Sequence, residues 1–301
     1  MTKYLIILVA FLLFASCGSN EKDQDGRFYI VTTTMMLEDA AKNIVGDLAR
    51  VESIMGPGVD PHLYRATPAD FRKMEQADII IYNGLMLEAR LAQVLAQQPE
   101  RAFAAGEVLS TDRLIEAFEY GGNYDPHVWF DVSLWIDVVQ GIASILIDRM
   151  PEHAEAIHQN TDEYVQKLTE LHDWVTQQIA QIPENRRVLI TAHDAFQYFG
   201  AAYNIDVRGL QGLSTQSEVG LRDISNMTRF IVEAEIPAIF LESSVPPRGI
   251  QSLINGVNQR GGSVELGGEL YSDAMGERGT EEGTYIGMVQ FNVNTIVGAL
   301  K

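Results

Sequence analysis

The chain has 301 residues and a formal net charge of −19 at pH 7. So acidic a surface repels phosphate backbones, and we therefore expect no nucleic-acid partner. The only cysteine is Cys17, which excludes an internal disulfide framework and leaves the hydrophobic core to stabilise the fold. The length is sufficient for two domains.

Residues 1–16 predict a lipoprotein signal peptide. Lys3 provides a positive start, an apolar run follows, and small residues precede Cys17. Phe14 stands where the usual lipobox has leucine, and the alternative is an ordinary signal peptide with an incidental cysteine. We expect lipidation of Cys17 and a polar tether over residues 17–27. No later apolar run approaches the roughly 20 residues of a membrane span, so one lipid anchor is expected.

After the tether, short apolar runs alternate with amphipathic stretches, which is the pattern of α/β units. We expect an N-terminal α/β lobe over residues 28–151. Its expected strands cover residues 28–31, 51–55 and 79–82, and its expected helices cover 36–45, a stretch from 68, 87–97 and 133–148.

A long helix is predicted over residues 152–182, which contain no glycine and no proline. Pro151 precedes this stretch and Pro183 follows it, as expected at helix ends. At 1.5 Å per residue the helix would be about 46 Å long, a rigid strut. Its apolar residues form one stripe, spaced by threes, fours and sevens: Ile157, Tyr164, Leu168, Leu171, Val175, Ile179 and Ile182.

The alternation resumes in an expected C-terminal α/β lobe over residues 183–301. Its expected strands cover residues 188–192, 238–241 and 264–266, and its expected helices cover 217–234, 248–259 and 285–300. The predicted fold class is therefore α/β, with two lobes of open sheets flanked by helices and joined by one long rigid helix.

The tripeptide Asp-Pro-His occurs twice, ending once in His62 and once in His127. Proline restricts φ to near −65° and stiffens each turn, which suits a side chain held at a set position. His193 follows a predicted strand directly, and Asp273 lies beyond the strand near residue 264. In open α/β sheets, ligands bind outside the carboxyl ends of the strands. Two candidates from each lobe predict a site in the cleft between the lobes.

Three imidazoles and one carboxylate are a plausible ligand set for a divalent transition metal. Each residue also has another explanation. His62 and His127 fit turn histidines bonded to the backbone. His193 fits a satisfied core histidine, and Asp273 fits a solvated or turn-forming acid. The residues by themselves favour metal binding and leave these alternatives open.

Five ordered motifs resemble those of the cluster A-I substrate-binding lipoproteins of metal ABC transporters, the TroA/ZnuA-like group also called bacterial solute-binding protein family 9. They are GVDPHLYRATPAD (58–70), DPHVWFD (125–131), TAHDAFQYF (191–199), ESSVPP (242–247) and GGELYSDAMG (267–276). The resemblance covers nearly the whole mature chain. It implies that the metal ligands are His62, His127, His193 and Asp273.

The resemblance also implies a function without catalysis. We expect an exported, membrane-anchored monomer, on the periplasmic or extracellular face, that delivers a divalent metal ion to an ABC permease. Manganese or zinc is the expected cargo, and iron is a third candidate. Manganese-dedicated members often carry glutamate where His193 stands, and zinc-dedicated members often carry a histidine-rich loop, whereas residues 110–124 contain no histidine.

Two other functions remain as alternatives. A zinc hydrolase would need an open coordination position and a general base, for which Asp194 and Glu242 are weak candidates. The His-Glu-x-x-His motif is absent from the sequence. A surface adhesin is the third reading, because that role is often ascribed to lipoproteins of the group.

Overall fold

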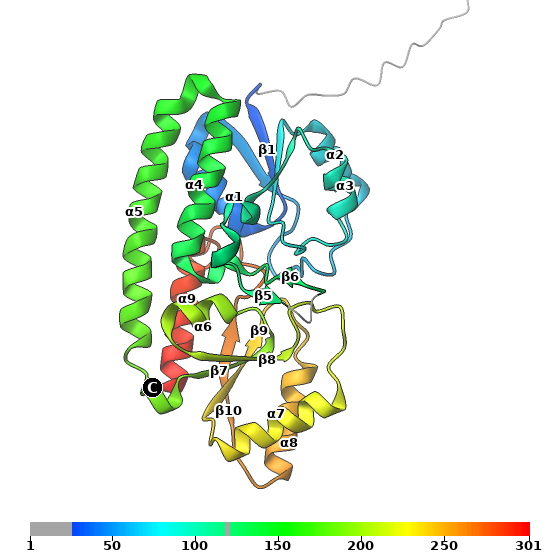
Figure 1. Cartoon of the computed structure of the whole chain (residues 1–301), viewed down its shortest axis with the longest axis vertical. Coiled ribbons are helices and arrows are strands. Elements are labelled where there is room, and N and C mark those ends of the chain that lie inside the picture. Colours follow the sequence, from blue (N-terminus) through cyan, green and yellow to red (C-terminus); the bar gives the residue numbers. More distant parts are fainter. Residues whose placement is uncertain (1–25, 118–120) are drawn as a thin grey trace, which may run out of the picture.

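The computed structural model describes residues 26–117 and 121–301 (Figure 1). The predicted signal peptide, Cys17 and most of the predicted tether lie outside these residues. No helix within the described ranges is long and apolar enough to cross a membrane.

The first half of the chain forms a parallel sheet in the order β2-β1-β3-β4. Successive side chains of a strand point to opposite faces. Ile30 therefore joins the core on the α1 side, whereas Val31 packs with Met74 of α2 and Leu95 of α3. The elements are β1 (Phe28–Thr32), α1 (Met35–Val45), β2 (Ala49–Ser53), α2 (Pro68–Gln76), β3 (Ile79–Tyr82), α3 (Ala92–Ala96) and β4 (Ala102–Ala104).

The helix predicted over residues 87–97 is shorter than expected, because α3 begins only at Ala92. The carboxylate of Glu88 is buried and accepts hydrogen bonds from the backbone N–H of Asn83 (2.8 Å) and of Gly84 (3.2 Å). These bonds hold the preceding residues in a turn, which delays the start of the helix.

The predicted strut is α5 (Ala154–Ile179), which follows α4 (Val132–Arg149) after a short 3-10 turn. Asp131 caps α4 by accepting the N–H of Ser133 at 2.8 Å. The 26 residues of α5 span about 39 Å. Every residue of the predicted apolar stripe is buried. The helix α5 contacts α1 and α4 of the first half and α9 (Tyr285–Leu300) of the second. The amphipathic pattern therefore predicted the strut correctly.

The second half contains two parallel strand pairs, β7 with β8 and β9 with β10. β7 also lies beside β9. A small antiparallel hairpin of β5 and β6 lies between the halves (Figure 1). The elements are β5 (Glu116–Ala117), β6 (Asn123–Tyr124), β7 (Val188–His193), α6 (Gln197–Tyr203), β8 (Asp206–Gln211), α7 (Leu221–Glu233), β9 (Ala238–Glu242), α8 (Arg248–Gln259), β10 (Glu265–Leu270) and α9 (Tyr285–Leu300).

Sequence patterns missed β4, α6 and β8. β4 has three residues and α6 seven, which gives little pattern. β8 contains the charged Asp206 and Arg208 among its six residues, so it does not form an apolar run. Tertiary pairing with β7 supplies the hydrogen bonds that the local sequence does not predict.

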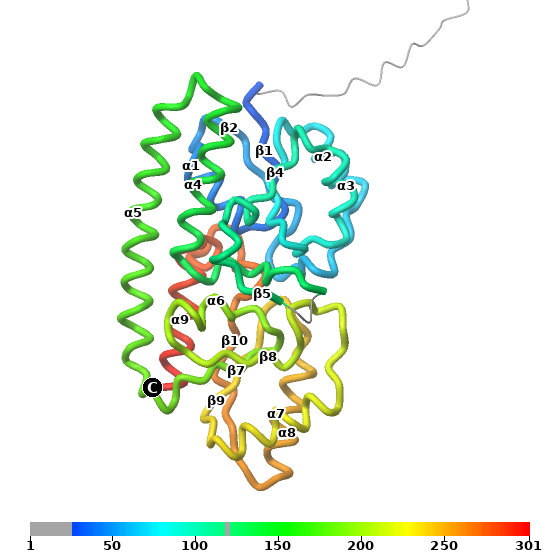
Figure 2. Tube along the Cα trace, viewed as in Figure 1, coloured from blue at the N-terminus to red at the C-terminus, as the bar shows by residue number. Residues whose placement is uncertain are grey.

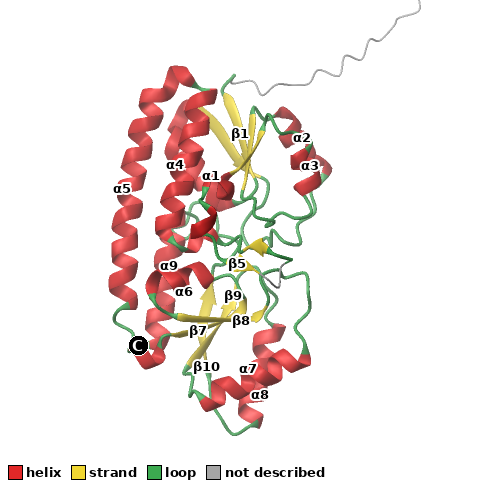
Figure 3. Cartoon of the chain, in the orientation of Figure 1, coloured by secondary structure: helices red, strands yellow, loops and turns green. Residues whose placement is uncertain are grey.

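One hydrophobic core crosses both halves. Trp135 of α4 stacks on Tyr285 of α9 with ring centroids 5.3 Å apart, and the same core contains Ile44 of α1 and Phe196 of the second half. The helices α4, α5 and α9 run along the same side of the molecule (Figures 2 and 3). The predicted α/β class, with open parallel sheets flanked by helices and one long helix, is confirmed. Because the core is continuous, packing resists large movements of one half against the other.

Candidate metal centre

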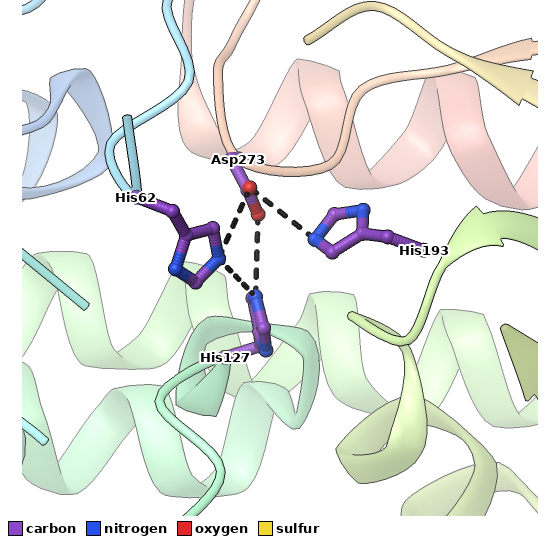
Figure 4. A group of neighbouring side chains, drawn as sticks. All are labelled: His62, His127, His193 and Asp273. Carbon is purple, nitrogen blue, oxygen red and sulfur yellow. Dashed lines mark hydrogen bonds and ion pairs between the residues drawn. The ribbon is translucent and has the colours of Figure 1, made fainter. Parts of the chain in front are cut away.

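The four predicted site residues come together between the two halves (Figure 4). His62 lies in the loop between β2 and α2, and His127 precedes the short 3-10 turn that leads into α4. His193 is the last residue of β7, and Asp273 follows β10. One ligating atom from each residue lies within 4.8 Å of all the others.

Four separations between donor atoms are close to the edge length of a tetrahedral metal site. His62 Nε2 lies 3.3 Å from His127 Nε2, which in turn lies 3.4 Å from Asp273 Oδ1. Asp273 Oδ2 lies 3.3 Å from His193 Nε2 and 3.6 Å from His62 Nε2. Zinc–nitrogen bonds of about 2.0–2.1 Å produce tetrahedron edges of about 3.3–3.4 Å. One ion at the centre can therefore reach all four residues.

The centre is buried and contains polar atoms without partners. The three imidazoles are fully buried, and Asp273 is 2% exposed. Among the described residues, His193 Nε2 and both carboxylate oxygens of Asp273 have no hydrogen-bond partner. An unsatisfied buried polar atom costs about 1–3 kcal/mol, and several facing one point fit a site for a cation.

Carboxylates outside the centre orient two of the three imidazoles. His127 Nδ1 donates to Asp125 Oδ1 at 2.7 Å, and His193 Nδ1 donates to Glu242 Oε2 at 2.5 Å. Each bond directs the lone pair of Nε2 toward the centre, which is the usual arrangement behind a metal-ligating histidine. His62 differs, because its Nδ1 is buried without a partner in the described part of the chain.

Burial and charge shift the pKa values of the centre in different directions. Desolvation lowers the pKa of His62 to about 3, which keeps this imidazole neutral. Desolvation would also lower the pKa of His193, but the carboxylates of Glu242 and Asp273 outweigh it and raise the pKa well above 6.5. The pKa of Asp273 falls below 3.8, because the surrounding imidazoles outweigh the effect of its burial. The centre therefore presents an ionised carboxylate, and a metal ion must displace a proton from His193.

The two Asp-Pro-His segments use their aspartates differently. Asp125 Oδ1 accepts both the backbone N–H (2.9 Å) and the ring N–H of His127. Asp60 Oδ1 accepts the backbone N–H of His62 (2.8 Å) and of Leu63 (3.4 Å) but no ring N–H, while its Oδ2 accepts the hydroxyl of Thr215 from the second half (2.5 Å). One aspartate orients a ring, and the other connects the two halves of the molecule.

Sequence reasoning did not find the positioning roles of Asp125 and Glu242. The Asp-Pro-His repeat contained a signal for Asp125. Glu242 offered none, because it is 49 residues from His193 and meets it only through the contact of β7 with β9.

The remaining histidines lie away from the centre. His158 is exposed on α5, and His153 lies in the turn before this helix. His172 is partly buried and contacts the hydroxyl of Tyr203 at 3.1 Å. The structure thus separates the three predicted site histidines from the other three, of which His158 and His172 lie on the strut and His153 just before it.

Comparison with known proteins identifies relatives along nearly the whole chain. The family described as "Zinc-uptake complex component A periplasmic" matches residues 30–299. The manganese-binding lipoprotein MntA of Bacillus subtilis is 45% identical over 307 aligned positions, covering 100% of both chains. The zinc-binding protein TroA of Treponema pallidum is 43% identical over 285 positions, covering 94% of this chain and 92% of the relative.

Solved structures share the architecture. The periplasmic zinc-binding protein TroA from Treponema pallidum superimposes with a TM-score of 0.89 at 43% identity, covering 91% of this chain and 99% of that one. Fe(III)-bound YtgA from Chlamydia trachomatis superimposes with a TM-score of 0.82 at 26% identity, covering 91% and 98%.

Proposed function

The chain belongs to the family of periplasmic zinc-uptake component A proteins, and we propose that it captures one divalent transition metal ion and delivers it to an ABC permease. The family resemblance inferred from the five sequence motifs is confirmed by this match. Metal binding is thus the function of the protein, and its ligands and cargo are the parts that we propose here.

We assign the ligands as His62, His127, His193 and Asp273. The observation that carries this assignment is the set of donor separations of 3.3–3.6 Å inside a buried centre. With neutral imidazoles and one carboxylate, the loaded centre carries a net charge of about +1. The carboxylates of Asp125 and Glu242, behind two of the imidazoles, offset this charge.

We propose manganese or zinc as the cargo, with iron as a third candidate. Three imidazoles suit zinc, whereas both oxygens of Asp273 face the donors and allow a higher coordination number for manganese. Relatives of similar identity are named for manganese and for zinc. Affinities of a given site follow the Irving–Williams order, so we expect Zn²⁺ to displace Mn²⁺ in direct competition and the cellular supply to decide the cargo.

Metal analysis of protein purified without added metal, followed by titration with Mn²⁺ and Zn²⁺, tests this function. We expect one ion per chain, and loss of tight binding in His62→Ala. His158→Ala, an exposed histidine on α5, is the matched control and should bind like the wild type. Protein that retains neither metal, together with unaltered binding by His62→Ala, would contradict the proposal.

We further propose that a lipid on Cys17 anchors the protein outside the cytoplasm through a tether over residues 17–27. The lobes, residues 28–151 and 183–301, joined by residues 152–182, then present the centre to the permease. Cys17→Ser should move the protein from the membrane fraction to the soluble fraction. A variant that stays with the membrane would contradict the anchor without affecting the metal assignment.

A hydrolase is disfavoured by the geometry of the same residues. Four ligands complete a tetrahedron, and a catalytic zinc needs an open position. Glu242 accepts hydrogen bonds from the backbone and from the ring of His193, so its carboxylate is engaged. We therefore propose a binding role without turnover, and chelator-sensitive hydrolysis would be evidence against it.

A further inference from the structure

Arg278 connects the two halves of the molecule next to the proposed centre. It lies in the segment between Asp273 and α9. This segment reaches α1 of the first half (Figures 1 and 2). Its Nη2 donates to Glu38 Oε2 of α1 at 2.5 Å and to Ser53 Oγ at the end of β2 at 2.6 Å. The Glu38 side chain is 7% exposed and the Arg278 side chain 47%. We call these three residues the Arg278 bridge.

The first end of the Arg278 bridge is continuous with the loop that bears His62. Ser53 Oγ lies 2.7 Å from Glu38 Oε2 and 2.8 Å from the carbonyl oxygen of Met55. The six residues 56–61 then lead from Met55 to His62. The Arg278 bridge therefore bonds to the start of the loop that bears His62.

The second end is continuous with the loop that bears Asp273. Arg278 follows Asp273 by five residues, and the backbone N–H of Gly276 donates to the carbonyl of Glu282 at 2.8 Å. A Cβ at Gly276 would lie 2.7 Å from Glu282 Cβ, so the loop closes tightly on itself. Because this loop is closely packed, a bond that fixes Arg278 also limits the movement of Asp273.

We propose that Arg278 is a positioning residue that holds the Asp273 loop against the His62 loop and so slows the escape of the bound metal. The inference rests on the proposed metal ligands. Arg278 bonds to none of these four ligands within the described chain, and it acts through the loops. Because one core joins the halves, the loops are the parts free to separate. Without the bridge, the His62 loop and the Asp273 loop would lose this direct connection between them.

The dissociation rate of the metal is the measurement that reports this role. The full chain is loaded with Zn²⁺ and mixed with excess EDTA, and the release is followed by tryptophan fluorescence. Trp129 is a suitable reporter, because its ring centroid lies 5.2 Å from that of His127. The variants are Arg278→Gln, Arg278→Lys, Glu38→Gln and the double variant of both glutamines.

We expect Arg278→Gln to release Zn²⁺ about fivefold faster, as fits a charge-assisted pair that is partly exposed. Association should change little. Arg278→Lys should fall between the wild type and Arg278→Gln, because it keeps the charge and loses the second hydrogen bond. In the double variant the two effects should not add. Arg229→Gln is the matched control, since this exposed guanidinium bonds to Asn226 of its own helix.

Release by Arg278→Gln at the wild-type rate, or effects of Arg278→Gln and Glu38→Gln that simply add, would overturn the inference. An equal change in Arg229→Gln would also overturn it, because the effect would then be one of surface charge. If the wild type binds one ion and His62→Ala loses it, these outcomes leave the proposed function intact. Absence of metal binding by the wild type would overturn both proposals.

Discussion

Replacing Glu242 with glutamine tests whether a carboxylate that is hydrogen-bonded to the metal ligand His193 strengthens metal binding. Glu242 accepts two hydrogen bonds from His193, one from the backbone N–H at 2.7 Å and one from Nδ1 at 2.5 Å. A glutamine has only one acceptor oxygen. Glu242→Gln therefore places an amide NH₂ against one of two N–H groups in a fully buried site.

The size of the effect follows from this geometry. Loss of a carboxylate that orients a ligating histidine typically costs about 10–100-fold in metal affinity. This range equals about 1.4–2.8 kcal/mol of binding free energy. We expect the upper part of the range, because both oxygens of Glu242 are used and the residue is 2% exposed.

Isothermal titration with Zn²⁺ in the presence of a competing chelator measures the change. Glu265→Gln is the matched control, an exposed glutamate at the start of the neighbouring strand β10. Melting of the metal-free variants shows whether the fold is retained. If Glu242→Gln is folded and its Kd lies within about twofold of the wild type, the argument that this carboxylate orients His193 is wrong.

Three further predictions concern the site and the core. Asp125→Asn should weaken metal binding more than Asp60→Asn in the same titration, because only Asp125 bonds to an imidazole ring; equal losses would contradict the distinction. Acidification should release the metal, since the pKa of His193 lies well above 6.5 and each unit of falling pH then costs about tenfold in affinity; affinity independent of pH between 5 and 7.5 would refute this sign. Trp135→Ala should lower the free energy of unfolding by about 3–5 kcal/mol, measured with urea, because Trp135 is fully buried between the halves; a loss below about 1 kcal/mol would show that the shared core is not cooperative there.

Much of the fold was predictable because its causes are local. The stripe that begins at Ile157 predicted the strut, since a 3.6-residue period alone places apolar side chains on one face of a helix. The helix ending at Leu300 and the strand Ile79–Tyr82 were also predicted from local patterns, the strand from its short apolar run. The strand β8 was missed, because its hydrogen bonds come from β7 and its own residues lack a clear period.

The candidate site, too, was predictable only where its signals are local in sequence. Proline-stiffened turns marked His62 and His127, and the ends of strands marked His193 and Asp273, because both signals are local in sequence. The positions of these signals predicted a shared site between the lobes, but they could not give the distances between the donor atoms. The structure brings their donor atoms to 3.3–3.6 Å, through a core that joins both halves.

The sequence by itself determined the alternating α/β units, the strut and the stiff histidine turns, since neighbouring residues suffice to specify each of them. Only the tertiary structure decided which carboxylate orients which imidazole and which arginine connects the ligand loops. Glu242 is 49 residues from His193, and Arg278 is 240 residues from Glu38. Such contacts form only when strand pairing and core packing bring distant segments together. No local period in the sequence predicts them.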